Sequence, residues 1–219
     1  MGLGVLLRRA SGRLSQSGTL ARRLFGIDFP PRDDPDARYF DLTTPVLVSM
    51  VAPRLGPGMR LLDMGTGAFA TIGLALWRRT GCDVVATEVW PELVRKAQAS
   101  VDANRAPIRV VEARFFDGVE GEFDCVTFNA PYVPSRFLSR SDPRSDGGPD
   151  GTSVIEGFLE SFAAKGGHAT AYLGVNRLFV PRERVVPLVI RHAGLELTGV
   201  RCRWPWPVDV YVLTRIVKT

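Results

Sequence analysis

The feature that most constrains the fold is an alternation, from residue 43 onward, of helical segments with short apolar runs. Short apolar runs between turn residues are typical of buried strands. Repeated strand–helix alternation is typical of a parallel sheet covered on both faces by helices. We therefore expect an α/β fold with a doubly wound, seven-stranded, mostly parallel sheet. The expected strands are 60–63, 83–88, 108–112, 123–129, 168–175, 195–203 and 208–216, and the expected helices are 43–54, 68–79, 91–104, 154–164 and 181–193.

The last two expected strands have no helix between them. They are separated by Trp204-Pro205-Trp206-Pro207, in which the two prolines lack backbone N–H groups and cannot continue a strand. This segment is typical of a hairpin turn. The sequence therefore predicts that one antiparallel edge strand completes the sheet.

The charge distribution divides the chain into two parts. The net charge is +5, and residues 1–27 contain five arginines and no acidic residue, so the other 192 residues carry no net charge. Residues 27–37 hold three prolines and four aspartates, which is typical of a linker. We expect an N-terminal basic helix and linker at 1–41 and one catalytic domain at 42–219. A neutral core does not favour nucleic-acid binding.

Composition excludes several classes of protein. No window of 18 residues is apolar enough for a membrane span. The three cysteines are far apart and only two histidines are present, which argues against a disulfide framework and against a metal site. We expect a cytoplasmic protein, with organellar targeting by residues 1–27 as the alternative.

A glycine-containing turn follows the first expected strand. Asp63 ends that strand, and Gly65 and Gly67 precede a helix, so the backbone there can lie close to a ligand. Glu88 ends the second strand about 20 residues later, where a carboxylate can accept hydrogen bonds from both hydroxyls of a ribose. This order of strand, turn, helix and acid favours a nucleotide-like ligand over a purely structural turn.

A second motif follows the fourth expected strand. Asn129-Ala130-Pro131-Tyr132 stands where ligands bind in a doubly wound sheet. The Asn129 amide can accept a hydrogen bond from an –NH₂ group, while Pro131 stiffens the turn and Tyr132 offers a flat face for stacking. In isolation such a segment is a common surface turn; after this strand, a catalytic role is favoured.

Together these motifs resemble class I S-adenosylmethionine (SAM) methyltransferases, which have a Rossmann-like fold. The resemblance is strongest to the HemK-type N-methyltransferases, which carry an NPPY motif and methylate planar amide or amine nitrogens. The segment 147–151, Gly-Gly-Pro-Asp-Gly, resembles the GGxDG segment of that family, and 24–29 resembles the short entry to its catalytic domain. The resemblance covers residues 24–175.

The resemblance implies SAM as cofactor and a role for each motif residue. The backbone at Gly65, Thr66 and Gly67 would approach the methionine part of SAM, and Asp63 its ammonium group. Glu88 would bind the ribose, Phe115 would lie beside the adenine, and Val89 would also contact the cofactor. Asn129 would contact the cofactor and hold the target nitrogen, the Ala130 carbonyl would accept its second hydrogen, and Pro131 and Tyr132 would shape the acceptor site.

Several positions depart from the family pattern. Phe69 replaces a third glycine, Arg114 stands where an acidic residue is usual, and Ala130 replaces the first proline of NPPY. Leu42-Thr43-Thr44-Pro45 replaces a Pro-Glu-Thr-Glu-like segment. Phe69 is expected to narrow the cofactor site, and Arg114 puts the usual contact with the adenine amino group in doubt.

We therefore expect a SAM-dependent N-methyltransferase acting on a planar amide or amine nitrogen of a protein or small molecule. His168 and His192 are interpreted as packing and helix-end residues rather than catalytic ones. One alternative is an adenine N-methyltransferase of DNA or RNA, which usually needs a basic channel. A second is an inactive methyltransferase-fold scaffold subunit, and an NAD-dependent dehydrogenase is a weaker third.

Overall fold

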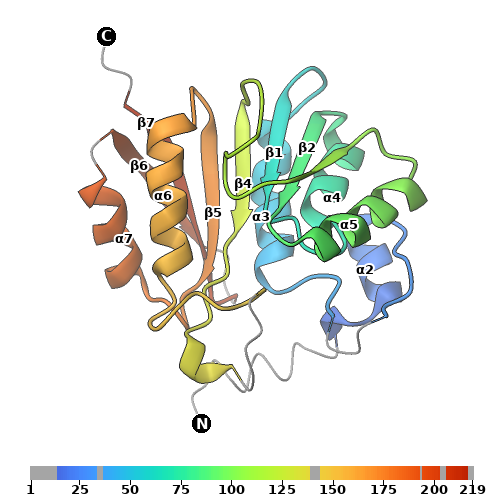
Figure 1. Cartoon of the computed structure of the whole chain (residues 1–219), viewed down its shortest axis with the longest axis horizontal. Helices are drawn as coiled ribbons and strands as arrows, with labels where there is room; N and C mark the ends of the chain where they lie inside the picture. The colour runs from blue at the N-terminus through green and yellow to red at the C-terminus, as the bar shows by residue number, and fades with distance from the viewer. Residues whose placement is uncertain (1–13, 34–36, 139–143, 193, 203–205, 217–219) are drawn as a thin grey trace.

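The protein forms one seven-stranded sheet between two layers of helices (Figure 1). This computed structural model describes residues 14–33, 37–138, 144–192, 194–202 and 206–216. The strand order is β3-β2-β1-β4-β5-β7-β6. The strands are β1 (Arg60–Met64), β2 (Asp83–Glu88), β3 (Arg109–Glu112), β4 (Cys125–Asn129), β5 (Thr170–Asn176), β6 (Leu195–Cys202) and β7 (Val208–Arg215).

The helices alternate with the strands as the sequence predicts. The α-helices are α2 (Gly18–Phe25), α3 (Thr43–Val51), α4 (Thr71–Thr80), α5 (Pro91–Ala103), α6 (Ser153–Lys165) and α7 (Arg182–Arg191), and short 3₁₀ helices occur at η1 (Ala52–Arg54) and η2 (Ser135–Phe137). Among the described residues, no helix combines the length and apolar character that crossing a membrane requires. The expected α/β doubly wound sheet is confirmed.

One strand runs against the others. β7 pairs antiparallel with β5 on one side and with β6 on the other, whereas β1 to β5 pair in parallel. The single antiparallel strand is confirmed, but it lies one position inside the edge, between β5 and β6. β6 and β7 pair with each other, and β7 is the strand that joins β5. The predicted Trp204–Pro205 part of that turn lies outside the described residues.

Each face of the sheet buries its own core. Leu61, Val84 and Cys125 face α3, α4 and α5, whereas Leu62, Val126 and Leu173 face α6 and α7. Successive side chains of a strand point to opposite faces, so a strand buried on both faces must be apolar throughout. This two-sided burial explains why the parallel strands are continuous apolar runs in the sequence.

The N-terminal segment packs into the first of these cores. Phe25 and Ile27 are buried with α3 and α4, and Tyr39 contacts Phe29 and Phe69. The Phe69 ring centroid lies 4.5 Å from that of Tyr39 and 6.0 Å from that of Phe29. Phe69, which stands where the family pattern has a glycine, is thus only 6% exposed, and its ring packs against the N-terminal segment.

Helix α4 begins three residues later than expected. Ala70 has φ 47° and ψ 36°, a left-handed conformation that an α-helix cannot contain. The loop after β1 therefore extends from Gly65 to Ala70 before the helix starts.

Residues 1–13, which include three of the five arginines of the expected basic helix, lie outside the described part of the chain.

The contact between α3 and β5 depends on one glycine. A Cβ added at Gly174 would overlap the side chains of Thr43 and Leu47, so α3 approaches the sheet as closely as it does because no side chain intervenes. We predict that Gly174→Ala lowers the free energy of unfolding by about 1–3 kcal/mol, as overpacking usually does. Chemical denaturation measures this value. Gly56→Ala, where an added Cβ meets nothing within 4 Å, is the matched control, and equal stability of the two variants would contradict the prediction.

Candidate active site

The predicted site residues meet at the carboxyl edge of the sheet. Asp63 ends the pairing of β1 with β2, Glu88 ends β2, and Asn129 ends β4. Because β2, β1 and β4 are neighbours and run in parallel, their final residues lie side by side at one edge. The strand order therefore brings together the two carboxylates and the amide that the sequence predicts for the site.

The loop after β1 needs glycine at two positions. Gly65 and Gly67 have φ angles of 61° and 68°, a region that side chains disfavour. A Cβ at Gly65 would lie 3.0 Å from the Phe128 ring, whereas at Gly67 it would meet nothing within 4 Å. Thr66 N–H donates to the Thr87 carbonyl at 2.8 Å, which fixes the loop to the end of β2. The backbone at Gly67 thus faces open space into which a ligand can fit.

Glu88 is held by main-chain donors around it. Its Oε2 accepts from Gly67 N–H at 3.0 Å, and its Oε1 accepts from Val89 N–H at 2.8 Å. Burial raises the pKa of this carboxyl, while the main-chain bonds oppose the rise. The side chain is 6% exposed, and the Val89 side chain beside it is 46% exposed. The carboxylate is thus fixed in position at the edge of the sheet, with an apolar side chain next to it.

Asp63 lies beneath the glycine loop. Its carboxylate is fully buried and accepts from Thr66 Oγ1 at 2.6 Å, Thr127 Oγ1 at 2.9 Å and Gly73 N–H at 2.9 Å. Burial is the largest influence and raises the pKa of Asp63 to about 6. These contacts connect β1, β4 and the start of α4. Through the Thr66 hydroxyl, the buried carboxylate also stabilises the glycine loop.

Asn129 and Tyr132 both bind a residue that the sequence analysis missed. Asn129 Nδ2 donates to Asp41 Oδ1 at 3.1 Å, and the Tyr132 hydroxyl donates to Asp41 Oδ2 at 3.0 Å. The Tyr132 hydroxyl also lies 3.0 Å from Thr43 Oγ1. Asp41 precedes α3 by two residues, where an acid ordinarily indicates a helix cap, and no pattern in the sequence connects it with residue 129.

The other end of the Asn129 amide has no partner. Asn129 Oδ1 is buried and makes no hydrogen bond with any of the residues that the structure describes. An ionised carboxylate only accepts hydrogen bonds, so the amide nitrogen must face Asp41 and the oxygen must point away from it. A buried acceptor without a partner costs about 1–3 kcal/mol, and such groups in native proteins call for an explanation.

The segment 147–151 braces the Asn-Ala-Pro-Tyr loop. Gly147 N–H donates to the Val133 carbonyl and Ser135 N–H donates to the Gly148 carbonyl, both at 2.9 Å. Gly151 has φ 89°, and a Cβ there would overlap the Tyr132 carbonyl oxygen. The contact at Gly151 requires a glycine, and together with the two main-chain hydrogen bonds it places this segment against the candidate catalytic loop. Residues 139–143 of the intervening loop lie outside the described residues.

Phe115 and Arg114 follow β3, which runs parallel to β2 and ends at the same edge of the sheet. Phe115 has φ 53°, unusual for a bulky residue. Its ring lies edge-on to Phe128, with centroids 6.1 Å apart, and against Gly157 of α6. The exposed Arg114 guanidinium lies 5.7 Å from the Phe115 ring centroid. Strained positions of this kind cluster at functional sites.

The remaining candidate features lie apart from this edge. His168 is exposed just before β5, at the opposite end of the strands, with Nδ1 3.7 Å from a Glu122 oxygen. His192 follows α7 directly. Within the described residues, no cluster of three or more His, Cys, Asp or Glu side chains could hold a metal ion.

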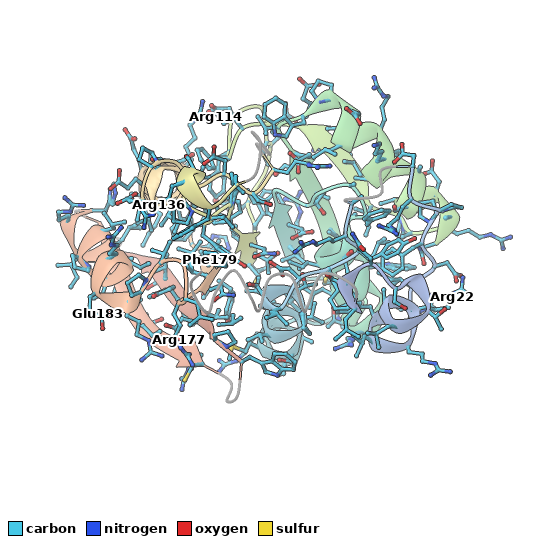
Figure 2. All side chains as sticks on the ribbon, turned by 90° about the horizontal axis from the view of Figure 1, so that it is seen from below. Arg22, Arg114, Arg136, Arg177, Phe179 and Glu183 are labelled. Carbon is cyan, nitrogen blue, oxygen red and sulfur yellow. The ribbon has the colours of Figure 1, made fainter. Side chains whose placement is uncertain are left out.

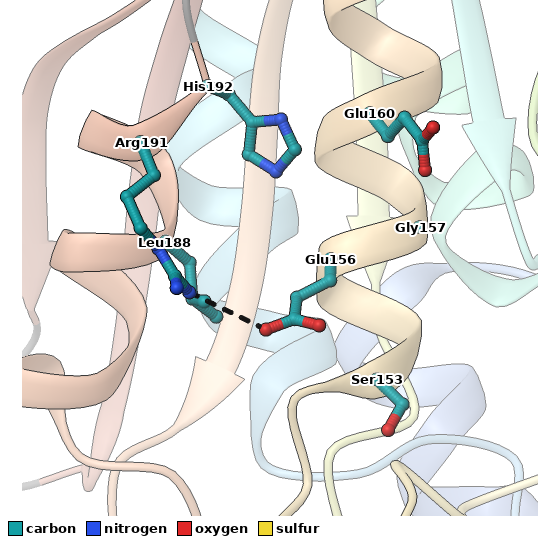
Figure 3. A pocket seen from close by; sticks show the side chains of 7 residues that line it. All are labelled: Ser153, Glu156, Gly157, Glu160, Leu188, Arg191 and His192. Atoms are coloured by element: carbon teal, nitrogen blue, oxygen red, sulfur yellow. Dashed lines mark ion pairs between the residues drawn. The ribbon is translucent and has the colours of Figure 1, made fainter.

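Two hollows in the structure involve other residues. One lies beside α2 and Phe29. The other lies between α6 and α7, and an ion pair of 3.7 Å joins Arg191 to Glu156 there (Figure 3). None of the predicted site residues lines either hollow.

Sequence comparison finds glutamine methyltransferases. The chain is 29% identical over 114 residues to a Methanocaldococcus jannaschii protein named as a protein N5-glutamine methyltransferase, covering 49% of this chain and 57% of that protein. It is 31% identical over 94 residues to the release factor glutamine methyltransferase of Deinococcus radiodurans, covering 42% and 33%. The chain thus spans less than two thirds of the length of these relatives. No protein-family model matches it.

Structural comparison finds methyltransferases. A methyltransferase from Pyrococcus furiosus matches with a TM-score of 0.63 at 20% identity, covering 96% of this chain and 99% of that one. The E. cuniculi Mtq2–Trm112 complex, described as responsible for methylation of the eRF1 termination factor, matches with a TM-score of 0.53 at 26% identity, covering 79% and 93%. The expected class I methyltransferase fold and the resemblance to HemK-type enzymes are confirmed.

The buried Asp63 carboxyl gives stability a specific pH dependence. Its folded pKa of about 6 lies above the ordinary value of 3.8, so between these pH values the folded state holds a proton that the unfolded chain releases. The stability from the protonated form is present below pH 3.8 and is lost as pH rises through 6. The difference in free energy of unfolding between the wild type and Asp63→Asn should fall by about 2 kcal/mol between about pH 4 and pH 7.

Chemical denaturation across this pH range measures the difference. Thr127→Val is a second variant, because it removes a hydrogen bond that favours the charged carboxylate. It should shift the loss of stability to higher pH. Parallel pH profiles for the wild type and Asp63→Asn would contradict the assignment.

Proposed function

We propose that this chain, a class I methyltransferase-fold protein with HemK-type relatives, is a SAM-dependent methyltransferase that modifies a primary amide nitrogen of a protein. The observation that carries the proposal is the Asn129 amide. Its nitrogen is bound to Asp41, and its buried oxygen lacks a partner. An amide –NH₂ group of an acceptor would supply the missing donor.

The cofactor side has groups that fit SAM. Glu88 is fixed where a carboxylate can take the ribose hydroxyls, and Val89 and Phe115 supply apolar surface for the adenine. The open backbone at Gly67, with Thr66 and Gly65, suits the methionine part, and Asp63 holds this loop in place. SAM supplies a methyl group already activated by its sulfonium, so the work of the protein is orientation and exclusion of water.

The acceptor side offers two hydrogen-bond acceptors to one nitrogen. The Asn129 oxygen and the Ala130 carbonyl can each accept one hydrogen of an –NH₂ group, which orients its lone pair and stabilises the positive charge that develops on it. Tyr132 packs beside the plane of the acceptor. Because the Asn129 oxygen is covered, an acceptor reaches it only when the surrounding segments shift. No strong general base is needed in this arrangement.

The surface beside Tyr132 suits a polypeptide. The ring centroids of Tyr132 and Phe179 lie 6.1 Å apart, and those of Phe179 and Phe137 lie 6.2 Å apart, with Arg136 stacked 4.7 Å from the Phe137 ring. Viewed onto the carboxyl edge, Arg136 and Arg177 lie on either side of Phe179 (Figure 2). Aromatic and arginine side chains are enriched at protein interfaces. This surface and the protein glutamine methyltransferase relatives both support a protein acceptor.

The alternatives have weaker support. The sequence relatives are protein methyltransferases, which does not favour an adenine acceptor in DNA or RNA. Phe69 and Arg114 are the residues that favour an inactive scaffold. The Phe69 ring packs against Tyr39 and Phe29, and the Arg114 guanidinium lies over the Phe115 ring. A small-molecule acceptor is a distinct outcome of the labelling experiment below.

We predict that Glu88→Ala weakens SAM binding by about 10- to 100-fold. Two hydrogen bonds to a carboxylate are lost, each worth about 1.5–3 kcal/mol before solvent compensates, and 1.4 kcal/mol is a factor of ten. Isothermal titration calorimetry measures the dissociation constant. Glu120→Ala, which changes an exposed carboxylate elsewhere, is the control. Equal affinity in both variants would remove Glu88 from the cofactor site.

We predict that Asn129→Ala lowers methyl transfer by about 100-fold or more, the usual effect of removing a group that stabilises transition-state charge, and leaves the SAM dissociation constant within about threefold. Gln98→Ala, which removes a surface amide of α5 that binds Asp102, is the control. Each protein is incubated with tritium-labelled SAM and an extract from cells that lack the active protein. Label should enter the protein fraction with the wild type and the control. Label in nucleic acid or in small molecules would overturn the proposed acceptor, and normal transfer by Asn129→Ala would overturn the site.

A further inference from the structure

We infer that Asp41 is a positioning residue for this reaction, because its carboxylate holds the Asn129 amide in the single orientation that turns oxygen, rather than –NH₂, toward the acceptor nitrogen. This inference rests on the proposed function and adds a residue from the N-terminal segment, far in sequence from the motifs that suggested it.

The Asp41 carboxylate is itself firmly placed. Its Oδ1 accepts from Thr43 N–H and Thr44 N–H, both at 2.9 Å, and from Thr44 Oγ1 at 3.0 Å. These donors belong to the first turn of α3, whose N–H groups have no partner within the helix. The negative charge also lies at the end of α3 that favours it. The carboxylate is therefore oriented by α3 independently of Asn129.

The orientation of an Asn amide is not fixed by its shape. Its oxygen and nitrogen ends are nearly equal in size, so a half-turn about the final side-chain bond exchanges a donor for an acceptor. A carboxylate at 3.1 Å from Nδ2 removes this ambiguity, because the exchanged orientation would place two oxygens against each other. Asp41 thus selects one of two otherwise similar states.

The selected state is the one that the reaction requires. An acceptor –NH₂ group presents hydrogens, so it needs an acceptor atom opposite them. With Nδ2 on Asp41, Asn129 offers its partnerless Oδ1. In the exchanged orientation it would offer its own –NH₂, and two donors would face each other. Asp41 acts on the reaction through Asn129, without touching the acceptor.

Asp41 also binds the last residue of the motif. Its Oδ2 accepts from the Tyr132 hydroxyl at 3.0 Å. Ala130 replaces a family proline between Asn129 and Tyr132, which makes the connecting segment less rigid. One carboxylate therefore joins both ends of this segment to α3.

The test removes the group that distinguishes the two ends of the Asn129 amide. In Asp41→Ala neither orientation of the amide is selected. We expect methyl transfer into the protein fraction labelled by the wild type to fall about 10- to 100-fold, with SAM affinity within about twofold. Asp28→Ala, which breaks an exposed ion pair with Arg22 on the same N-terminal segment, is the matched control and should retain activity.

Rescue by the conservative variant separates positioning from a need for the negative charge. In Asp41→Asn, the Thr43 and Thr44 N–H groups keep the side-chain oxygen where Oδ1 lies in the wild type, so this oxygen still accepts from Asn129 Nδ2. Asp41→Asn should therefore recover at least about fivefold of the activity lost in Asp41→Ala. Wild-type activity in Asp41→Ala, or an equal loss in Asp41→Asn and Asp41→Ala although both fold and bind SAM, would overturn the inference.

A second variant separates positioning from the capping of α3. Thr44→Val removes a different hydrogen bond to the same carboxylate and leaves the Asn129 bond in place, so it should keep methyl transfer within about threefold of the wild type. A loss as large as that of Asp41→Ala would overturn the inference.

A spectroscopic readout does not depend on activity. The side-chain amide of Asn129, assigned by its loss in Asn129→Ala, should give a single shifted pair of ¹⁵N–¹H signals in the wild type and change in Asp41→Ala. If the wild type transfers no methyl group, the proposed function fails, while this signal still decides whether Asp41 holds the amide. An Asn129 signal that is insensitive to Asp41→Ala would overturn the inference by itself.

Discussion

The arrangement depends on the parallel pairing of β2, β1 and β4. Parallel strands place all their carboxyl ends at one edge, so residues that end different strands become neighbours. Asp63, Glu88 and Asn129 are separated by 25 and 41 positions in the chain, and pairing alone brings them together. The apolar side chains of these strands are buried on both faces, so Asp63, Glu88 and Asn129 lie at the end of a fully covered part of the sheet.

Most of the fold and the three site residues could be predicted because they depend on local patterns. Continuous apolar runs indicate strands buried on both faces, and the residue after such a run lies at the edge where ligands bind. The position of β7 in the sheet and the start of α4 were harder to predict. The pattern of strands does not show which strand of the last hairpin pairs with β5. The start of α4 depends on Ala70, which adopts a left-handed conformation that alanine rarely takes.

The features that the sequence did not reveal are contacts between distant segments. Asp41 lies 88 residues from Asn129, and its local context indicates only a helix cap. The role of Phe69 also depends on a contact with a distant segment. Phenylalanine in place of a motif glycine predicted a narrowed cofactor site, but in the structure the ring packs against Tyr39 of the N-terminal segment. A side chain that departs from a motif can be understood only when its packing partner is known.

The N-terminal segment therefore contributes to both halves of the site. Through Tyr39 it gives the Phe69 ring a place in the core beside the glycine loop, and through Asp41 it orients Asn129 and Tyr132. Alanine at position 130, in place of the motif proline, makes the segment 129–132 less rigid. Two contacts from distant segments restrain it: the Asp41 carboxylate binds Asn129 and Tyr132, and the glycine-rich segment 147–151 binds the residues that follow. A chain that relies on contacts between distant segments for catalytic geometry can tolerate change within the motif as long as those contacts persist, because orientation of Asn129 is then determined by the folded core and not by the stiffness of four residues.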